Sequence, residues 1–173
     1  MDVMNTPNST LLDKCQKLLP EIRFIEASSF YWSPRNNSVY MNTKALADQA
    51  GQWALLHESG HALSNHQSYQ TDAGLLILEV EAWRAAVILG KKLGVVISED
   101  HVQECLNTYR DWLYARSTCP TCSLNSLQID ETTYLCINCS CKWSVSSSRF
   151  CRPYRMQDRH KKTPSELPQT VFM

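Results

Sequence analysis

Long apolar runs are missing from this chain of 173 residues. No segment approaches the roughly 20 apolar residues of a membrane-spanning helix, and the first twenty residues lack the basic start and apolar centre of a secretion signal. We therefore expect a cytoplasmic protein with no membrane partner. Net charge is missing as well, because 17 Lys and Arg balance 17 Asp and Glu. The length suits one domain with a core plus a small accessory module.

The chain has eight cysteines, and half of them follow a regular spacing. Without an export signal, metal binding is a better interpretation of these cysteines than disulfide bonding. Cys119 and Cys122 form one C-x2-C pair, and Cys136 and Cys139 form a second pair 13 residues later. This spacing is typical of a zinc ribbon. We predict that the four thiolates bind a structural zinc, with Cys141 as an alternative to Cys139.

The five residues His57-Glu58-Ser59-Gly60-His61 match the pattern H-E-x-x-H. Residues four apart on a helix share a face, so the two histidines can bind one ion. Glu58 lies about 100° round the helix, where a carboxylate can act as a general base on zinc-bound water without becoming a ligand. Apolar flanks indicate a buried helix, in which charge needs a partner such as a metal. A catalytic zinc site is the main hypothesis, and a chance pattern on a solvated helix is the alternative.

A third ligand is expected elsewhere, because a catalytic zinc usually has three protein ligands. The extended motif with a third histidine needs Gly at 64 and His at 67, where this chain has Ser64 and Gln67. His66 is expected at the surface. Glu79 and Glu81 lie about 200° apart on the next predicted helix, so only one can face the ion. Glu79 falls among apolar residues, which favours it, and an ion pair with a buried base is its alternative role.

These residues resemble the ImmA/IrrE-type metallopeptidases. The resemblance covers residues 22–95 and depends on the H-E-x-x-H motif, on a strand predicted before it and on the later sequence Glu79-Val80-Glu81-Ala82. It implies a minimal zincin fold, with Glu79 as the third ligand and Glu58 as the base. Trp83 and Ala85 stand where the family commonly has Asn or Asp and then an aromatic residue. A hydrogen bond to a ligand histidine is therefore expected to be missing or to come from elsewhere.

The predicted elements indicate an α+β fold in three parts. We expect a zincin-like domain with a small antiparallel sheet plus helices at residues 1–116, a zinc ribbon at 117–151 and a basic, mobile tail at 152–173. Helices are predicted over 9–19, 43–65 with a break near Gly51, 72–93 and 98–113. Strands are predicted over 22–26, 30–32 and 38–42. The last of these is the candidate edge strand for binding a substrate.

A zinc-dependent endopeptidase with one catalytic and one structural zinc is the leading hypothesis, and the resemblance implies regulatory proteolysis of a protein substrate. One alternative is an SprT-like protease that acts on DNA-bound proteins, although the third ligand in such proteases is typically histidine. Another is a non-catalytic ribbon that binds nucleic acid or protein. Basic and aromatic residues of the C-terminal region are compatible with nucleic-acid contact, and a tail that binds nothing is equally compatible. These residues are Lys142, Trp143, Arg149, Phe150, Arg152, Tyr154, Arg155, Arg159, Lys161 and Lys162.

Overall fold

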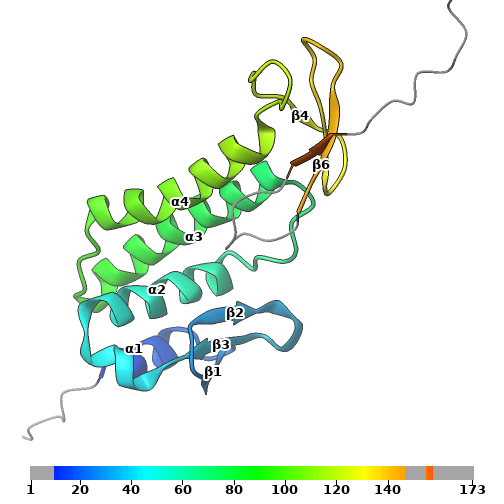
Figure 1. Ribbon diagram of the computed structural model, residues 1–173. Coiled ribbons are helices and arrows are strands. Elements are labelled where there is room, and N and C mark those ends of the chain that lie inside the picture. Colours follow the sequence, from blue (N-terminus) through cyan, green and yellow to red (C-terminus); the bar gives the residue numbers. More distant parts are fainter. Residues whose placement is uncertain (1–9, 147–154, 158–173) are drawn as a thin grey trace, which may run out of the picture. The chain divides into compact units, whose positions relative to one another are not determined.

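The computed structural model describes residues 10–146 and 155–157. The chain divides into two compact units, residues 1–113 and residues 114–173. Helices and small sheets together give a mixed α+β architecture (Figure 1). No helix in the described ranges is long and apolar enough to cross a membrane.

Four described α-helices lie wholly or mostly in the first unit. They are α1 (Leu11–Leu18), α2 (Gln49–Leu63), α3 (Asp72–Leu93) and α4 (Glu99–Ser117), whose last residues belong to the second unit. Thr10 and Asp13 form a capping box at the start of α1. The Thr71 side chain accepts a hydrogen bond from the Gly74 N–H at the start of α3, and Gly94 ends this helix with a φ of 80°.

The helical region predicted over residues 43–65 consists of two elements. A 3-10 helix, η2 (Thr43–Ala47), is followed by α2, and the two are separated at Asp48. The predicted break near Gly51 is thus present, three residues earlier at Asp48, and the glycine itself lies inside α2. A Cβ at Gly51 would collide with the backbone carbonyl of Ala45, so the glycine lets η2 fold closely against α2.

The first sheet has the strand order β1-β3-β2 and is mixed. β3 (Ser38–Met41) pairs parallel with β1 (Arg23–Glu26) and antiparallel with β2 (Tyr31–Ser33). The predicted antiparallel sheet is therefore wrong for one pair, because the chain reverses twice between β1 and β3. The edge-strand assignment of residues 38–42 is also wrong, since β3 is central and β1 and β2 form the edges.

The core of the first unit lies around α2, which packs between α3 and the first sheet (Figure 1). The backbones of α2 and α3 approach so closely that a Cβ at Gly60 would collide with the carbonyl oxygen of Ala82. The buried apolar residues of this core include Val39, Met41, Leu55, Leu56, Trp83, Ala86, Leu89, Val102 and Leu106. The H-E-x-x-H residues therefore belong to the central helix of the unit.

The second unit contains an antiparallel sheet of order β4-β5-β6-β7. Its strands are β4 (Leu127–Gln128), β5 (Thr133–Leu135), β6 (Lys142–Val145) and β7 (Arg155–Gln157). β7 falls in the segment predicted to be a mobile tail, and the other residues of that segment lie outside the described ranges. The small core consists of the stacked rings of Tyr134 and Trp143 together with Val145 and the cysteines Cys119 and Cys136.

Candidate metal centres

Three side chains from α2 and α3 converge on one point. The Nε2 atoms of His57 and His61 are 3.2 Å apart. Glu79 Oε2 lies 3.2 Å from His57 Nε2 and 3.7 Å from His61 Nε2. Zinc bonds of about 2.0–2.2 Å in a tetrahedron place ligand atoms roughly 3.4 Å apart. The three separations fit one face of such a tetrahedron, so this group could hold a metal ion.

Glu79 is buried, as its position on the apolar face of the helix predicts. Its side chain is 6% exposed, whereas that of Glu81 is 50% exposed. Within the described part of the chain, Glu79 Oε2 accepts no well-aligned hydrogen bond even though both imidazoles lie close to it. Burial acts to raise the pKa of Glu79, but His57 and His61 outweigh burial and lower it. A buried oxygen of an ionised carboxylate that accepts no well-aligned hydrogen bond is a suitable ligand atom for a cation.

Glu58 lies beside this group and is not part of it. Its Oε2 accepts a hydrogen bond of 2.8 Å from the backbone N–H of Trp32 in β2. The open edge of the first sheet therefore runs next to the central residues of the motif. This position agrees with a carboxylate that acts near a metal without binding it.

His66 is buried, and the prediction of a surface residue is wrong. It is 5% exposed, and its Nδ1 lies 2.8 Å from His61 Nδ1. Its Nε2 lies 3.2 Å from Glu81 Oε2. Burial lowers the pKa of His66 more than the hydrogen bond to Glu81 raises it, which favours the neutral ring. Helical periodicity does not reveal this contact, because it depends on the left-handed backbone of Asn65 (φ 49°) just after α2 ends.

Trp83 supports the other histidine by stacking. Its ring lies 4.2 Å from the His57 ring at an interplanar angle of 25°, and it meets His101 edge to face at 5.5 Å. His57 Nδ1 is buried and makes no hydrogen bond to any described residue. The tryptophan thus occupies the place where the resemblance leads one to expect Asn or Asp. The two histidines are held differently, His57 by a ring contact and His61 by a hydrogen bond.

The four cysteines of the predicted ribbon also converge. Cys119 Sγ lies 3.6 Å from Cys139 Sγ, and Cys122 Sγ lies 3.5 Å from Cys136 Sγ. These distances are too long for disulfides and close to the roughly 3.8 Å between sulfur atoms that share a zinc ion at about 2.3 Å. Cys141 is not in this group, so the geometry favours Cys139 as the fourth donor. The Ser126 side chain and nearby backbone amides lower the pKa of Cys136 to about 6, which favours the thiolate.

The residues proposed for nucleic-acid contact are only partly described. Trp143 is fully buried and its Nε1 donates a hydrogen bond to the Arg116 carbonyl, so it is not available to stack on a base. Lys142 is exposed. The other basic and aromatic residues of that prediction either lie outside the described residues or, as with Arg155, have an undescribed side chain.

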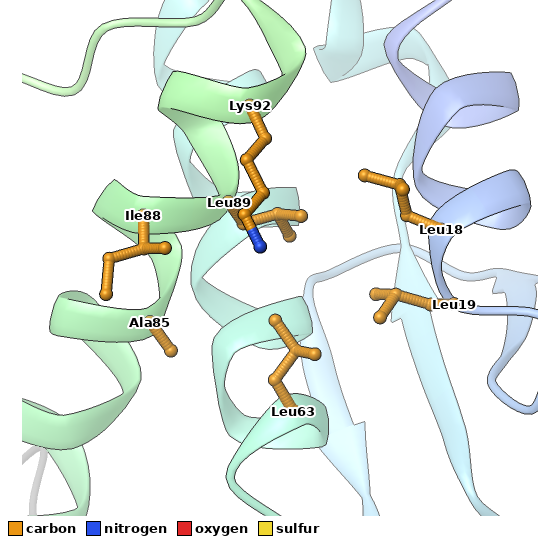
Figure 2. A pocket seen from close by; sticks show the side chains of 7 residues that line it. All are labelled: Leu18, Leu19, Leu63, Ala85, Ile88, Leu89 and Lys92. Carbon is orange, nitrogen blue, oxygen red and sulfur yellow. The ribbon is translucent and has the colours of Figure 1, made fainter.

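An apolar pocket of about 230 Å³ lies among α1, α2 and α3 (Figure 2). Its walls include Leu18 at the end of α1 and the following Leu19, Leu63 of α2 and Ile88 of α3, and Lys92 is the one charged side chain that lines it. None of the converging histidines and glutamates lines this pocket. It is therefore separate from the candidate metal centre.

No family model matches the chain, and neither the curated proteins nor the solved structures give a match. The resemblance to the ImmA/IrrE-type metallopeptidases therefore stays a prediction from the motif residues. Two groups of side chains, one of histidines and glutamate and one of cysteines, could each bind a metal ion.

Proposed function

We propose that this protein is a zinc-dependent endopeptidase of the ImmA/IrrE type, in which His57, His61 and Glu79 hold the catalytic ion and Glu58 is the general base. The observation that carries the proposal is the set of three donors, separated by 3.2 to 3.7 Å, with a further carboxylate beside them. Three protein donors leave one tetrahedral position open, as catalytic zinc sites require. The cysteine group has four donors and fits a closed, structural zinc.

His57, His61 and Glu79 would hold the ion, which when bound would lower the pKa of a coordinated water towards about 7 and polarise a substrate carbonyl. Glu58 receives the proton as the water attacks the peptide carbonyl, and it then passes the proton to the departing amine. The hydrogen bond from the Trp32 N–H to Oε2 fixes the orientation of the carboxylate and leaves Oε1 for this transfer. The net reaction is hydrolysis of one peptide bond.

The substrate is an extended segment of a protein, which lies along the open edge of β2. Main-chain pairing with an edge strand recognises a backbone with little regard to side chains. β2 is the edge strand that contacts Glu58, which takes the Trp32 N–H, so a segment aligned along the rest of this edge passes the general base. We place the reaction in regulatory proteolysis in the cytoplasm. The glutamate among the three donors favours this family over an SprT-like protease, whose third ligand is typically histidine.

The Glu58→Gln variant tests this proposal. Glutamine can still accept the Trp32 hydrogen bond through its carbonyl oxygen, but it cannot take a proton. We expect hydrolysis of an unfolded protein substrate to fall about 10²- to 10⁴-fold. The melting temperature and the content of two zinc ions per chain should stay unchanged. Glu104→Gln, which neutralises an exposed carboxylate on α4, is the matched control.

Two results would contradict the proposal. Wild-type rates of hydrolysis in Glu58→Gln would remove the general base from the mechanism. The zinc content of the wild type, Cys119→Ser and Glu79→Ala is measured by mass spectrometry. If the wild type binds zinc only through its cysteines, the proposed catalytic centre is wrong.

A further inference from the structure

A chain of hydrogen bonds leads from Glu81 through His66 to the side of His61 that faces away from the candidate metal centre. Glu81 Oε2 lies 3.2 Å from His66 Nε2, and His66 Nδ1 lies 2.8 Å from His61 Nδ1. The far nitrogen of His61, Nε2, faces His57 and Glu79. We propose that Glu81 and His66 are positioning residues that fix the proton of His61 on Nδ1 and so direct its Nε2 lone pair to the metal. This inference rests on the metal centre of the proposed function and does not depend on peptidase activity.

The direction of every hydrogen bond in this chain follows from its carboxylate end. An ionised carboxylate only accepts hydrogen bonds, so His66 Nε2 carries the proton that is donated to Glu81. A neutral imidazole has one N–H, so His66 Nδ1 is an acceptor, and the proton between the two rings belongs to His61 Nδ1. His61 then has its lone pair on Nε2. A single acceptor at one end therefore determines the tautomers of two histidines.

The backbone around His66 is built to hold this arrangement. The left-handed residue Asn65 reverses the chain after α2, so that the His66 N–H donates a hydrogen bond of 3.1 Å to the His61 carbonyl. The His66 carbonyl in turn accepts a hydrogen bond of 2.9 Å from Trp32 Nε1. His66 is thus fixed through its backbone as well as its ring. Glu81, at the other end, is half exposed and keeps contact with solvent.

His57 provides an internal reference for the proposal. It stacks on Trp83, and its Nδ1 has no hydrogen-bond partner among the described residues. Removing the Glu81–His66 chain should therefore change the tautomer of His61 and leave the stacking of His57 on Trp83 as it is. A loss of packing in the whole unit would instead change both histidines together.

The test is nitrogen NMR of full-length protein labelled with ¹⁵N-histidine, recorded without metal and with zinc, together with zinc affinity from chelator competition. His66→Phe keeps a flat ring without hydrogen bonds, and His66→Asn restores an acceptor near the position of Nδ1. Glu81→Gln replaces the obligate acceptor with a group that can also donate. Glu104→Gln is the control for loss of a carboxylate. Circular dichroism melting checks that each variant is folded.

We expect wild-type His61 to carry its proton on Nδ1 in the metal-free protein. In His66→Phe the His61 signals should show mixed tautomers, and zinc affinity at the histidine site should fall about 10- to 100-fold. His66→Asn should recover most of this loss. Glu81→Gln should lower zinc affinity by a smaller factor, and Glu104→Gln should match the wild type.

A wild-type His61 protonated on Nε2 in the metal-free protein would overturn the proposal. An unchanged His61 tautomer and unchanged zinc affinity in His66→Phe would also overturn it. If the wild type still binds two zinc ions, this second result leaves the proposed function intact. A folded wild type that takes up zinc only at its cysteines would overturn the proposed function and the metal-directing role together. The tautomer of His61 is measured without metal. Failure of the positioning role can therefore be distinguished from failure of the proposed function.

Discussion

The two candidate metal centres are built in opposite ways. The histidines and the glutamate project from two long helices that pack against each other through a core of large apolar side chains. The cysteines come from turns next to short strands, and two of them are themselves part of a core of five buried residues. We therefore expect the helical unit to have enough buried apolar surface to fold without a metal, and the second unit to need one. A metal ion would be an addition to the first fold and a component of the second.

Removing a cysteine donor should have the largest effect on folding and metal content, and this effect should be confined to the second unit. In Cys119→Ser we expect the second unit to lose its zinc and unfold, because metal binding contributes about 10–16 kcal/mol to small zinc domains. The helical unit should keep its melting temperature. Metal analysis and the NMR signal of the buried Trp143 indole measure both effects. Cys141→Ser is the matched control and should retain the zinc. A folded second unit in metal-free Cys119→Ser would contradict the expectation that this unit needs a metal to fold.

Glu79→Gln should affect binding strongly and folding weakly. We expect the zinc content to fall from two ions to one, with a loss of roughly 100-fold or more in affinity at the histidine site, because an anionic donor is replaced by a neutral amide. The metal-free unit should lose a little stability, because His57 and His61 favour the ionised form of Glu79 in the folded state and lower its pKa. Zinc titration and urea unfolding measure the two effects. Glu81→Gln should still take up two ions at saturating zinc, and equal zinc loss in both variants would contradict the assignment of Glu79.

Gly60→Ala tests whether the helix packing sets the geometry of the histidine site. The new methyl group meets the Ala82 carbonyl, so α2 and α3 must separate. We expect the helical unit to lose about 1–3 kcal/mol of stability, as is typical of overpacking, and zinc affinity at the histidine site to fall as well. Zinc at the cysteine site is the internal reference and should not change. If Gly60→Ala reduces stability but leaves zinc affinity at the histidine site unaltered, the packing of α2 against α3 does not set the geometry of that site.

Cys15 should give the smallest effect, and the shift of its pKa is opposite in sign to that of Cys136. Burial raises the pKa of Cys15 to about 12 from an ordinary value of 9.0. The unfolded thiol ionises first as the pH rises, so this contribution to stability is full below pH 9 and is lost between pH 9 and about 12. Cys15→Ala should make that alkaline loss shallower. Urea unfolding of the helices at several alkaline pH values measures this, and identical pH slopes would contradict it.

The sequence predicts those features that depend on local pattern. The caps Thr71 and Gly94 define α3, and helical periodicity places Glu79 inside and Glu81 outside. The features it misses depend on tertiary contact. The parallel pairing of β1 with β3 follows from the insertion of β3 between the two earlier strands. The contact of His66 with His61 requires the left-handed turn at Asn65, which has no periodic signal.

The close packing of α2 against α3 also affects the two motif positions that the H-E-x-x-H pattern leaves open. Ser59 is fully buried and its hydroxyl donates a hydrogen bond of 2.8 Å to the Leu55 carbonyl. Gly60 has no room for a side chain. If these two codons were randomised in a library selected for zinc binding, position 60 would return glycine and position 59 only small residues. We therefore expect all five motif positions to be restricted in this protein. The two histidines and the glutamate are restricted by their proposed chemistry, and Ser59 and Gly60 by the space available to their side chains.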